Sequence, residues 1–387
     1  MSLIKQINLL TNIRNASFKT TLRAASTKGI TLSYDKDPQP LFADPETQKL
    51  LKSITQLNLS KIFRKRAVKD NSVEYKFMTT EDVEEEFRKA VEKAKTKLQM
   101  PPVVQIKEDD QKVISEDKAL KGFSKTKFVI TDITYGVRQT ERKVVVRETD
   151  GTLRYAPMEV AKRVKQLYAP LDGRKIIKPK MFEDEHLQRC LEEHKYEFIL
   201  DRLLVQYDPY EPEFHRLSAK VYQHINETKE FEQLRSTRHF GPMAFFFAWH
   251  KTIDDLLYDM VRRDHLRNGA ELIALYYKIH NVPENYTELL AQLDKYQSLE
   301  ESVLKELRSK LKPAVKGDIN EEIETAIGKS AQDFEVDDLC IKFIERYVTS
   351  HALKKVQLEL ALQTLKEINT EKKQLFEGLT KAHGVQK

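Results

Sequence analysis

Hydrophobic residues recur with a helical period over most of the chain. In the stretch ADPETQKLLKSITQLNLSKIF, residues 43–63, Leu50, Ile54 and Leu57 fall on one face of a helix. Asp44 stands where a side chain can cap the first turn, and the proline after it occupies the first helical position. The pattern therefore predicts an amphipathic helix over this stretch.

A second helical pattern, TTEDVEEEFRKAVEKAKTKLQM, covers residues 79–100. Its acids cluster in the first turns and its lysines in the last, which complements the helix dipole. Pro101 and Pro102 stop the pattern. Residues 103–120 lack periodicity and are expected to form an extended linker.

The pattern changes to that of strands in the middle of the chain. KFVITDITYGV (127–137) and RKVVVRETDGTLRYA (142–156) are rich in β-branched residues, and TDGT supplies a hairpin turn in the second. We expect a small antiparallel sheet here. A short basic helix should follow over 157–168, and then an exposed loop, DGRKIIKPK, over 172–180.

From Phe182 onward the pattern is helical throughout, without a fixed repeat period. The predicted fold class is α+β, mostly α, with N-terminal helices, a small antiparallel β unit and then a helical array. The predicted divisions are a leader over 1–34, N-terminal helices and linker over 35–120, the basic β unit over 121–181, and an α-helical domain over 182–387.

The predicted leader is basic and amphipathic. It holds five Lys or Arg residues and no acid before Asp35, and its remaining positions are rich in Ser, Thr and Asn. This combination is typical of a mitochondrial transit peptide, which we expect to be removed near residues 23–27. The alternative is an ordinary basic helix or a disordered tail.

Composition adds two constraints. Charged residues make up 33% of the 387 residues, and there are only two cysteines, Cys190 and Cys340. Two cysteines cannot form a disulfide framework, so nothing supports a secreted protein. Residues 121–180 contain 15 Lys and Arg against 6 Asp and Glu, a net charge of +9. This segment, and not the chain as a whole, would face an anionic polymer.

The basic segment is the stronger nucleic-acid candidate. Tyr135, Tyr155 and Tyr168 are interleaved among its cations, but it carries no RNP motif, zinc finger or KH loop. Contact with the RNA backbone is therefore a better hypothesis than base reading, and a solvated basic face is the alternative. The candidate contacts are Lys125, Lys127, Arg138, Arg142, Lys143, Arg147, Arg154, Arg174, Lys175, Lys178 and Lys180.

One stretch, FEQLRSTRHFGPMAFFFAWHKTID at 231–254, combines cations with a burst of aromatics. Its apolar run, GPMAFFFAW, is nine residues long, far below the roughly 20 needed to span a bilayer. Gly-Pro should instead start a helix whose first two turns are apolar on every side. The aromatic residues are therefore expected in the core or in an interface with another protein; they are Phe245, Phe246, Phe247 and Trp249.

Arg235 and Arg238 stand just ahead of that predicted helix. Cations beside the free N–H groups of a helix start can hold a phosphate, so both are additional candidates for RNA contact. The alternative is that they pair with nearby acids such as Glu230 and Glu232.

Signs of catalysis are weak. The tripeptide Gly-Lys-Ser at 328–330 lacks the glycine a P-loop needs, because Ile323 stands at that position. His186, Cys190 and His194 have the spacing of one helical face, but structural zinc usually takes ligands from two segments and no second pair exists. These patterns therefore support neither a catalytic residue nor a bound metal.

Five runs in sequence order resemble a known family. They are LQMPP (98–102), SEDKALKG (115–122), KFVITDITY (127–135), ERKVVVRETDGTLR (141–154) and LRSTRHFGPM (234–243). Together they are similar to the mitochondria-specific family of small-subunit ribosomal proteins numbered twenty-two, from about residue 45 to 285.

The resemblance implies a structural component of the mitochondrial small ribosomal subunit. Its expected partners are the small-subunit rRNA and other small-subunit ribosomal proteins, in the mitochondrial matrix. It implies no catalysis and no cofactor. We also expect no membrane span and no small-molecule substrate. The alternative hypothesis is a helical adaptor subunit, or an enzyme, of another mitochondrial matrix complex.

Overall fold

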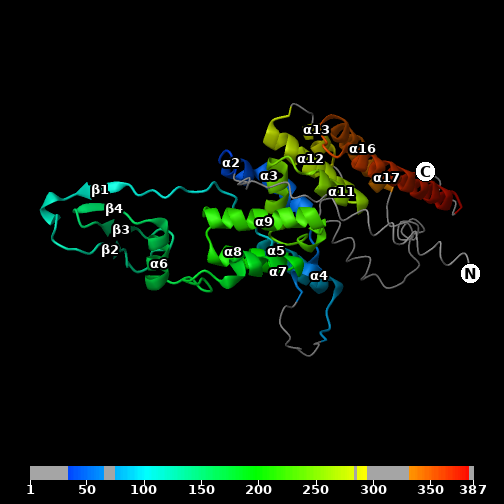
Figure 1. The fold of residues 1–387 in the computed structure, drawn as a ribbon. Helices are drawn as coiled ribbons and strands as arrows, with labels where there is room; N and C mark the ends of the chain where they lie inside the picture. Colours follow the sequence, from blue (N-terminus) through cyan, green and yellow to red (C-terminus); the bar gives the residue numbers. More distant parts are fainter. Residues whose placement is uncertain (1–33, 65–74, 283–285, 294–330, 383–387) are drawn as a thin grey trace, which may run out of the picture. The chain divides into compact units, whose positions relative to one another are not determined.

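The protein is mostly helical with one small antiparallel sheet, which confirms the predicted fold class (Figure 1). The predicted transit peptide lies, apart from Tyr34, outside the described residues. The computed structural model describes residues 34–64, 75–282, 286–293 and 331–382.

Side chains cap the starts of three of the four N-terminal helices. These helices are α2 (Gln39–Ala43), α3 (Pro45–Thr55), α4 (Leu59–Ile62) and α5 (Thr80–Lys97). The Asp44 carboxylate accepts the backbone N–H of Thr47 at 3.2 Å, as its position predicted. The expectation of one helix over 43–63 is wrong, because Gln56 takes a positive φ of 61° and separates α3 from α4. The Ser236 N–H bonds to the Thr55 carbonyl at this break, so a distant loop helps to end α3.

The sheet has four strands in the order β1-β4-β3-β2, all antiparallel. They are β1 (Val113–Glu116), β2 (Phe128–Thr131), β3 (Val144–Arg147) and β4 (Thr152–Tyr155). The predicted hairpin between β3 and β4 is present, and Gly151 turns it at a φ of +90°. A Cβ at this glycine would lie 2.0 Å from the Asp117 carbonyl oxygen, so the close approach requires glycine. The predicted linker is wrong at its C-terminal end, because β1 pairs there with β4.

One face of the sheet is covered by α6 (Met158–Tyr168), the predicted basic helix. Val144 and Val146 of β3 are buried there with Ala156, and Ala161 and Val164 of α6 pack against them. Alternate side chains of a strand point to opposite faces, so the other residues of β3 lie on the face that α6 does not cover.

The rest of the described chain is helical. Its elements are α7 (Asp184–Glu192), α8 (Tyr196–Gln206), α9 (Pro212–Thr228), α10 (Phe240–Trp249), α11 (Asp254–Arg262), α12 (Leu266–His280), α13 (Tyr286–Leu293), α16 (Ala331–Ser350) and α17 (Lys355–Ala382), with short 3₁₀ turns at Lys118–Leu120, Lys180–Phe182 and Phe231–Gln233. Packed pairs include α8 with α9, α12 with α16, and α17 with both α11 and α16 (Figure 1).

The centre of the helical core is α10. Every residue from Phe240 to Ala248 is buried, and the helix packs on α3 and α12. The helix begins at Phe240, so Pro242 occupies its third position and not the predicted first. An apolar surface on all sides of a helix requires burial on all sides, and here the chain's own helices supply it.

Candidate nucleic-acid interface

Arg142 organises the loop between β2 and β3 and does not project from it. Its guanidinium donates to three backbone carbonyls, those of Asp132 at 2.8 Å and of Thr134 and Val137 at 3.0 Å each. A guanidinium presents its donors in a fixed fork, so these three bonds occupy much of it. Arg142 therefore shapes the surface from which its neighbours project.

Glu148 is paired with two further candidates. Its carboxylate accepts from Lys127 at 2.8 Å and from Arg154 at 2.5 Å. The hydrogen bond from Lys127, and then that from Arg154, holds the pKa of this carboxyl below its usual range. Arg147 donates to the Gly151 carbonyl at 3.1 Å and so holds the hairpin turn. Arg147 and Arg154 are thus engaged within the sheet, whereas the Lys127 side chain remains 60% exposed beside its partner.

Three exposed candidates of the β unit have no acidic partner in the described part of the chain. Lys125, Arg138 and Lys143 are exposed, and in the described part of the chain their side chains make no ion pair. Tyr135, in the same loop as Arg138, is fully exposed. Lys121 and Arg163 are also exposed and without an ion pair there, although they were not among the candidates. The charge count of 121–180 includes both, and that count alone could have added them.

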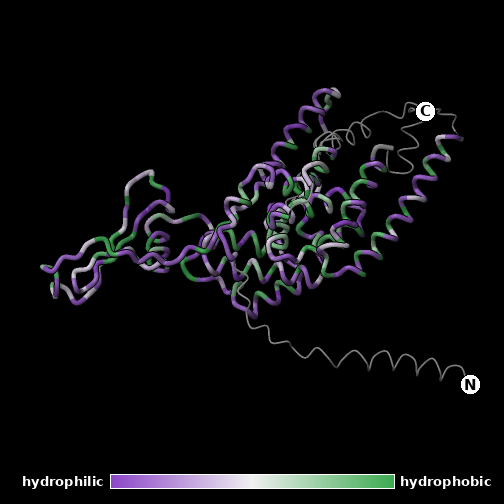
Figure 2. The backbone as a smooth tube through the Cα atoms, turned by 90° about the horizontal axis from the view of Figure 1, so that it is seen from above, coloured by the Kyte–Doolittle hydropathy of each residue, from purple (hydrophilic) through white to green (hydrophobic). Residues whose placement is uncertain are grey.

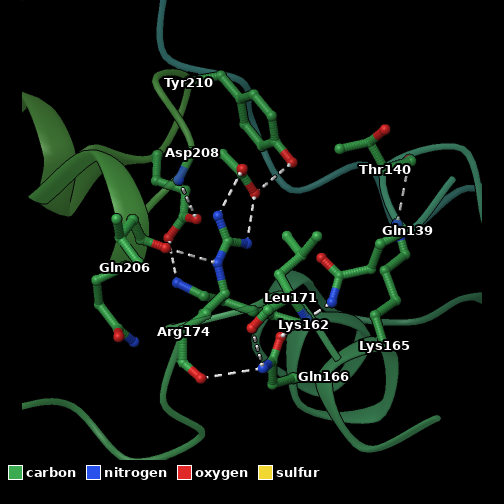
Figure 3. Close-up of polar contacts among 12 residues, drawn as sticks. Gln139, Thr140, Lys162, Lys165, Gln166, Leu171, Arg174, Gln206, Asp208 and Tyr210 are labelled. Carbon is green, nitrogen blue, oxygen red and sulfur yellow. Dashed lines mark hydrogen bonds and ion pairs between the residues drawn. The ribbon is translucent and has the colours of Figure 1, made fainter. Parts of the chain in front are cut away.

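Arg174 connects the loop after α6 to the end of α8 and the α8–α9 connection through hydrogen bonds and an ion pair (Figure 3). Its side chain is 6% exposed and donates to the Val205 carbonyl at 3.1 Å and to both oxygens of Asp208, at 3.1 and 2.9 Å. Burial alone raises the pKa of Asp208, but the hydrogen bonds and charge of Arg174 outweigh it and the net pKa is lowered. The prediction that Arg174 faces RNA is wrong, because its donors are used within the chain.

Other cations of the same loop are exposed to solvent. Lys175 is exposed, although its backbone N–H bonds to the Gln206 side chain at 3.0 Å, and Lys180 is exposed as well. Lys178 lies 3.5 Å from Glu213, with both side chains well exposed, and such a pair contributes little. The Gln166 side chain donates to the carbonyls of Leu171 and Arg174 and so fixes the loop from α6 (Figure 3).

The two arginines before α10 are paired with acids: Arg235 with a nearby one, as the alternative interpretation held, and Arg238 with one that is distant in sequence. Arg235 is 2% exposed, bonds to Glu232 at 2.8 Å and lies 3.8 Å from Asp259. A side chain this deeply buried cannot reach an rRNA phosphate, so this candidate is wrong. Arg238 is partly exposed, and it donates to Asp201 at 2.6 Å.

The aromatic candidates lie inside the chain's own core. Phe245, Phe246 and Phe247 are buried, and Phe245 packs edge-on against Phe42 of α2. Trp249 is partly exposed and donates its ring N–H to Asp35 at 2.9 Å. Of the two environments expected for them, the three phenylalanines occupy the core, so their side chains are not available to another protein.

The residues with metal-like spacing do not share a helical face. Helix α7 ends at Glu192, and His194 takes a positive φ of 55°. The His194 ring instead contacts Glu230 at 2.7 Å. In the part of the chain that the structure describes, no three His, Cys, Asp or Glu side chains gather in a group that could hold a metal ion. None of the described helices has the length and apolar character needed to cross a bilayer.

Comparison with known proteins decides the family. The family model described as "Mitochondrial 28S ribosomal protein S22" matches residues 40–281, more than half of the chain. The chain belongs to this family.

Two curated relatives agree with the family model. "Small ribosomal subunit protein mS22" of Mus musculus is 40% identical over 242 residues, which are 62% of this chain and 67% of the relative. The protein of the same name from Bos taurus is 38% identical over 245 residues, 63% of this chain and 68% of the relative. The resemblance carried by the five sequence runs is thus confirmed, and α16 and α17 lie outside the residues that the family model matches.

Proposed function

We propose that this chain is a structural constituent of the mitochondrial small ribosomal subunit. In that role it supports mitochondrial translation by binding the rRNA backbone and neighbouring ribosomal proteins in the matrix. The family match over residues 40–281 carries the proposal, and the relatives bear the name of a small-subunit protein. The role requires no catalytic residue and no cofactor.

The rRNA contact falls to the β unit. Lys125, Arg138 and Lys143 are exposed cations whose charge no acid of the described chain neutralises, so each is available to a phosphate. Lys175 and Lys180 extend the same basic segment along the loop after α6. Because the donors are charges on a shaped surface and no base-reading motif is present, the contact is to the backbone of a folded RNA.

The test is the salt dependence of binding to mitochondrial small-subunit rRNA. Each phosphate contact adds about 0.7 to 0.9 to the slope of log affinity against log salt. The triple variant K125Q/R138Q/K143Q should therefore reduce the magnitude of this slope by about 2 to 3, measured between about 50 and 200 mM KCl.

The matched control removes the same charge elsewhere. Lys76, Lys93 and Lys342 are exposed and make no ion pair within the described chain, so K76Q/K93Q/K342Q changes the net charge equally. Its slope should stay close to that of the unmodified chain. An unchanged slope in the β-unit variant would remove this surface from the RNA contact, and equal flattening in both variants would mean that general charge, and not this surface, drives binding.

A further inference from the structure

Helix α17 has two apolar faces. The inner one is buried and consists of Leu358, Leu362 and Leu365. The outer one is exposed: Val356 is 79%, Leu360 63%, Ile368 49% and Leu375 62% accessible. At about 100° per residue, the four outer residues span about 120° of the helix circumference. The centre of this arc lies about 150° around the helix from the centre of the inner face. Figure 2 shows hydrophobic and hydrophilic positions alternating along this helix.

The outer face is also acidic. By the same geometry, Glu367 and Glu371 lie among its apolar residues, and Glu359 and Glu377 lie about 60° beyond its edge, between the outer and inner faces. All four are exposed, and within the described chain none of them forms an ion pair. Glu367 accepts one hydrogen bond, from Gln363 on its own helix.

The lysines of α17 do not cancel these charges. Lys366 pairs with Glu345 of α16, and Lys373 lies 3.5 Å from Asp338, also of α16. Lys372, which flanks the outer set, lies 3.7 Å from Asp264. Lys381, beside the outer face, stands close to the end of α17. The middle of the outer face therefore presents apolar side chains and uncompensated glutamates together.

We propose that the outer face of α17 is a docking surface for a basic amphipathic helix of a neighbouring small-subunit protein. The partner's apolar side chains would cover Val356, Leu360, Ile368 and Leu375, over about 28 Å of helix. Its lysines or arginines would face the glutamates. This inference rests on the proposed ribosomal function, because that role places other small-subunit proteins around the chain.

Charge distinguishes this occupant from the others. An rRNA backbone or an anionic lipid surface would meet like charge at the four glutamates. A second copy of this chain would bring the same glutamates to the contact and would be repelled for the same reason. Four half- to mostly exposed apolar residues on one face of a helix suit packing against the apolar face of a second helix.

The experiment places a photo-crosslinking amino acid at residue 360 of the full chain in mitochondria. The isolated small subunit is irradiated, and the crosslinked peptide is identified. Leu360 is mostly exposed, so its replacement should leave the fold intact. Co-sedimentation of the substituted chain with small-subunit rRNA is measured in the same sample. A chain that does not co-sediment would overturn both the proposed function and this inference.

If the chain co-sediments, the crosslinked product decides the inference alone. The expected product is a peptide of another small-subunit protein with net positive charge and apolar residues at helical spacing. A crosslink to rRNA, to a second copy or to an acidic segment would overturn the inference, and so would the absence of any product.

A charge-reversal pair tests the role of the glutamates. E367K/E371K should lower the yield of the crosslink at least tenfold. The control E108K/E227K makes the same change in net charge at two exposed acids elsewhere and should leave the yield unchanged. An undiminished yield with E367K/E371K would show that the acids do not select the partner.

Discussion

Arg174 and Lys175 are adjacent in sequence and take opposite roles in the structure. The Arg174 guanidinium is buried against Asp208, whereas the Lys175 side chain is exposed. Replacing each by alanine therefore separates internal support from RNA contact within one loop. We expect Arg174→Ala to destabilise the loop without changing the salt dependence of RNA binding. Lys175→Ala should do the reverse.

The cost of Arg174→Ala follows from its contacts. The substitution removes three hydrogen bonds, one to the Val205 carbonyl and two to Asp208, and leaves that carboxylate without its cation. Breaking a fully buried ion pair costs about 3 to 5 kcal/mol. Asp208 is 20% exposed and keeps a hydrogen bond from Tyr210, so roughly 2 to 4 kcal/mol is the expected loss.

Native-state hydrogen exchange measures this loss locally. The backbone N–H of Lys175 bonds to the Gln206 side chain at 3.0 Å across the same junction, so its protection reports opening of the loop. A loss of 2 to 4 kcal/mol corresponds to exchange about 30 to 900 times faster. Unchanged protection in Arg174→Ala together with a flattened salt slope would refute this assignment and return Arg174 to the RNA contact.

Two further predictions concern stability. One carboxylate oxygen of Asp254 accepts the Tyr347 hydroxyl at 2.8 Å, and the other accepts two backbone N–H groups just ahead of α17. In urea titrations, Asp254→Ala should lower the free energy of unfolding by roughly 2 to 4 kcal/mol, and Asp254→Asn, which keeps one accepting oxygen, by less. Equal losses would show that the oxygen retained in asparagine contributes nothing. Burial lowers the pKa of His215, His239 and His265, so below about pH 6.5 the unfolded chain binds more protons than the folded one. The free energy of unfolding should therefore decrease as the pH is lowered, by up to about 1.4 kcal/mol per pH unit for each such histidine. A melting temperature that does not drop when the pH is lowered from about 7 to 5.5 would contradict this.

The elements predicted correctly are those whose signals are local. Helix α5 carries its capping box at Thr79 and Asp82, acids in its first turn and lysines in its last, all within one stretch of sequence. The hairpin between β3 and β4 is specified by its own turn. The all-round apolar surface of α10 likewise required burial whatever its neighbours were.

The features that could not be predicted, such as strand β1 and the buried Arg174, depend on partners that are distant in the sequence. Strand β1 is four residues long and exposed, and its pairing with β4 defines it as a strand. Arg174 is neutralised by Asp208, 34 residues later, in a connection that no spacing rule links to it. Counting charge along the chain located the basic segment correctly. It could not show which cations the fold uses internally, because that depends on which acids the tertiary structure places beside them.

The central claim is that this chain is part of the mitochondrial small ribosomal subunit. The most direct test follows the chain when a mitochondrial lysate is sedimented through a magnesium-depleted gradient, which separates ribosomes into subunits. We expect it to migrate with the small-subunit rRNA and to lose that position after RNase treatment. Migration at the top of the gradient, or with a complex that RNase leaves intact, would contradict the claim and favour an adaptor of another matrix complex.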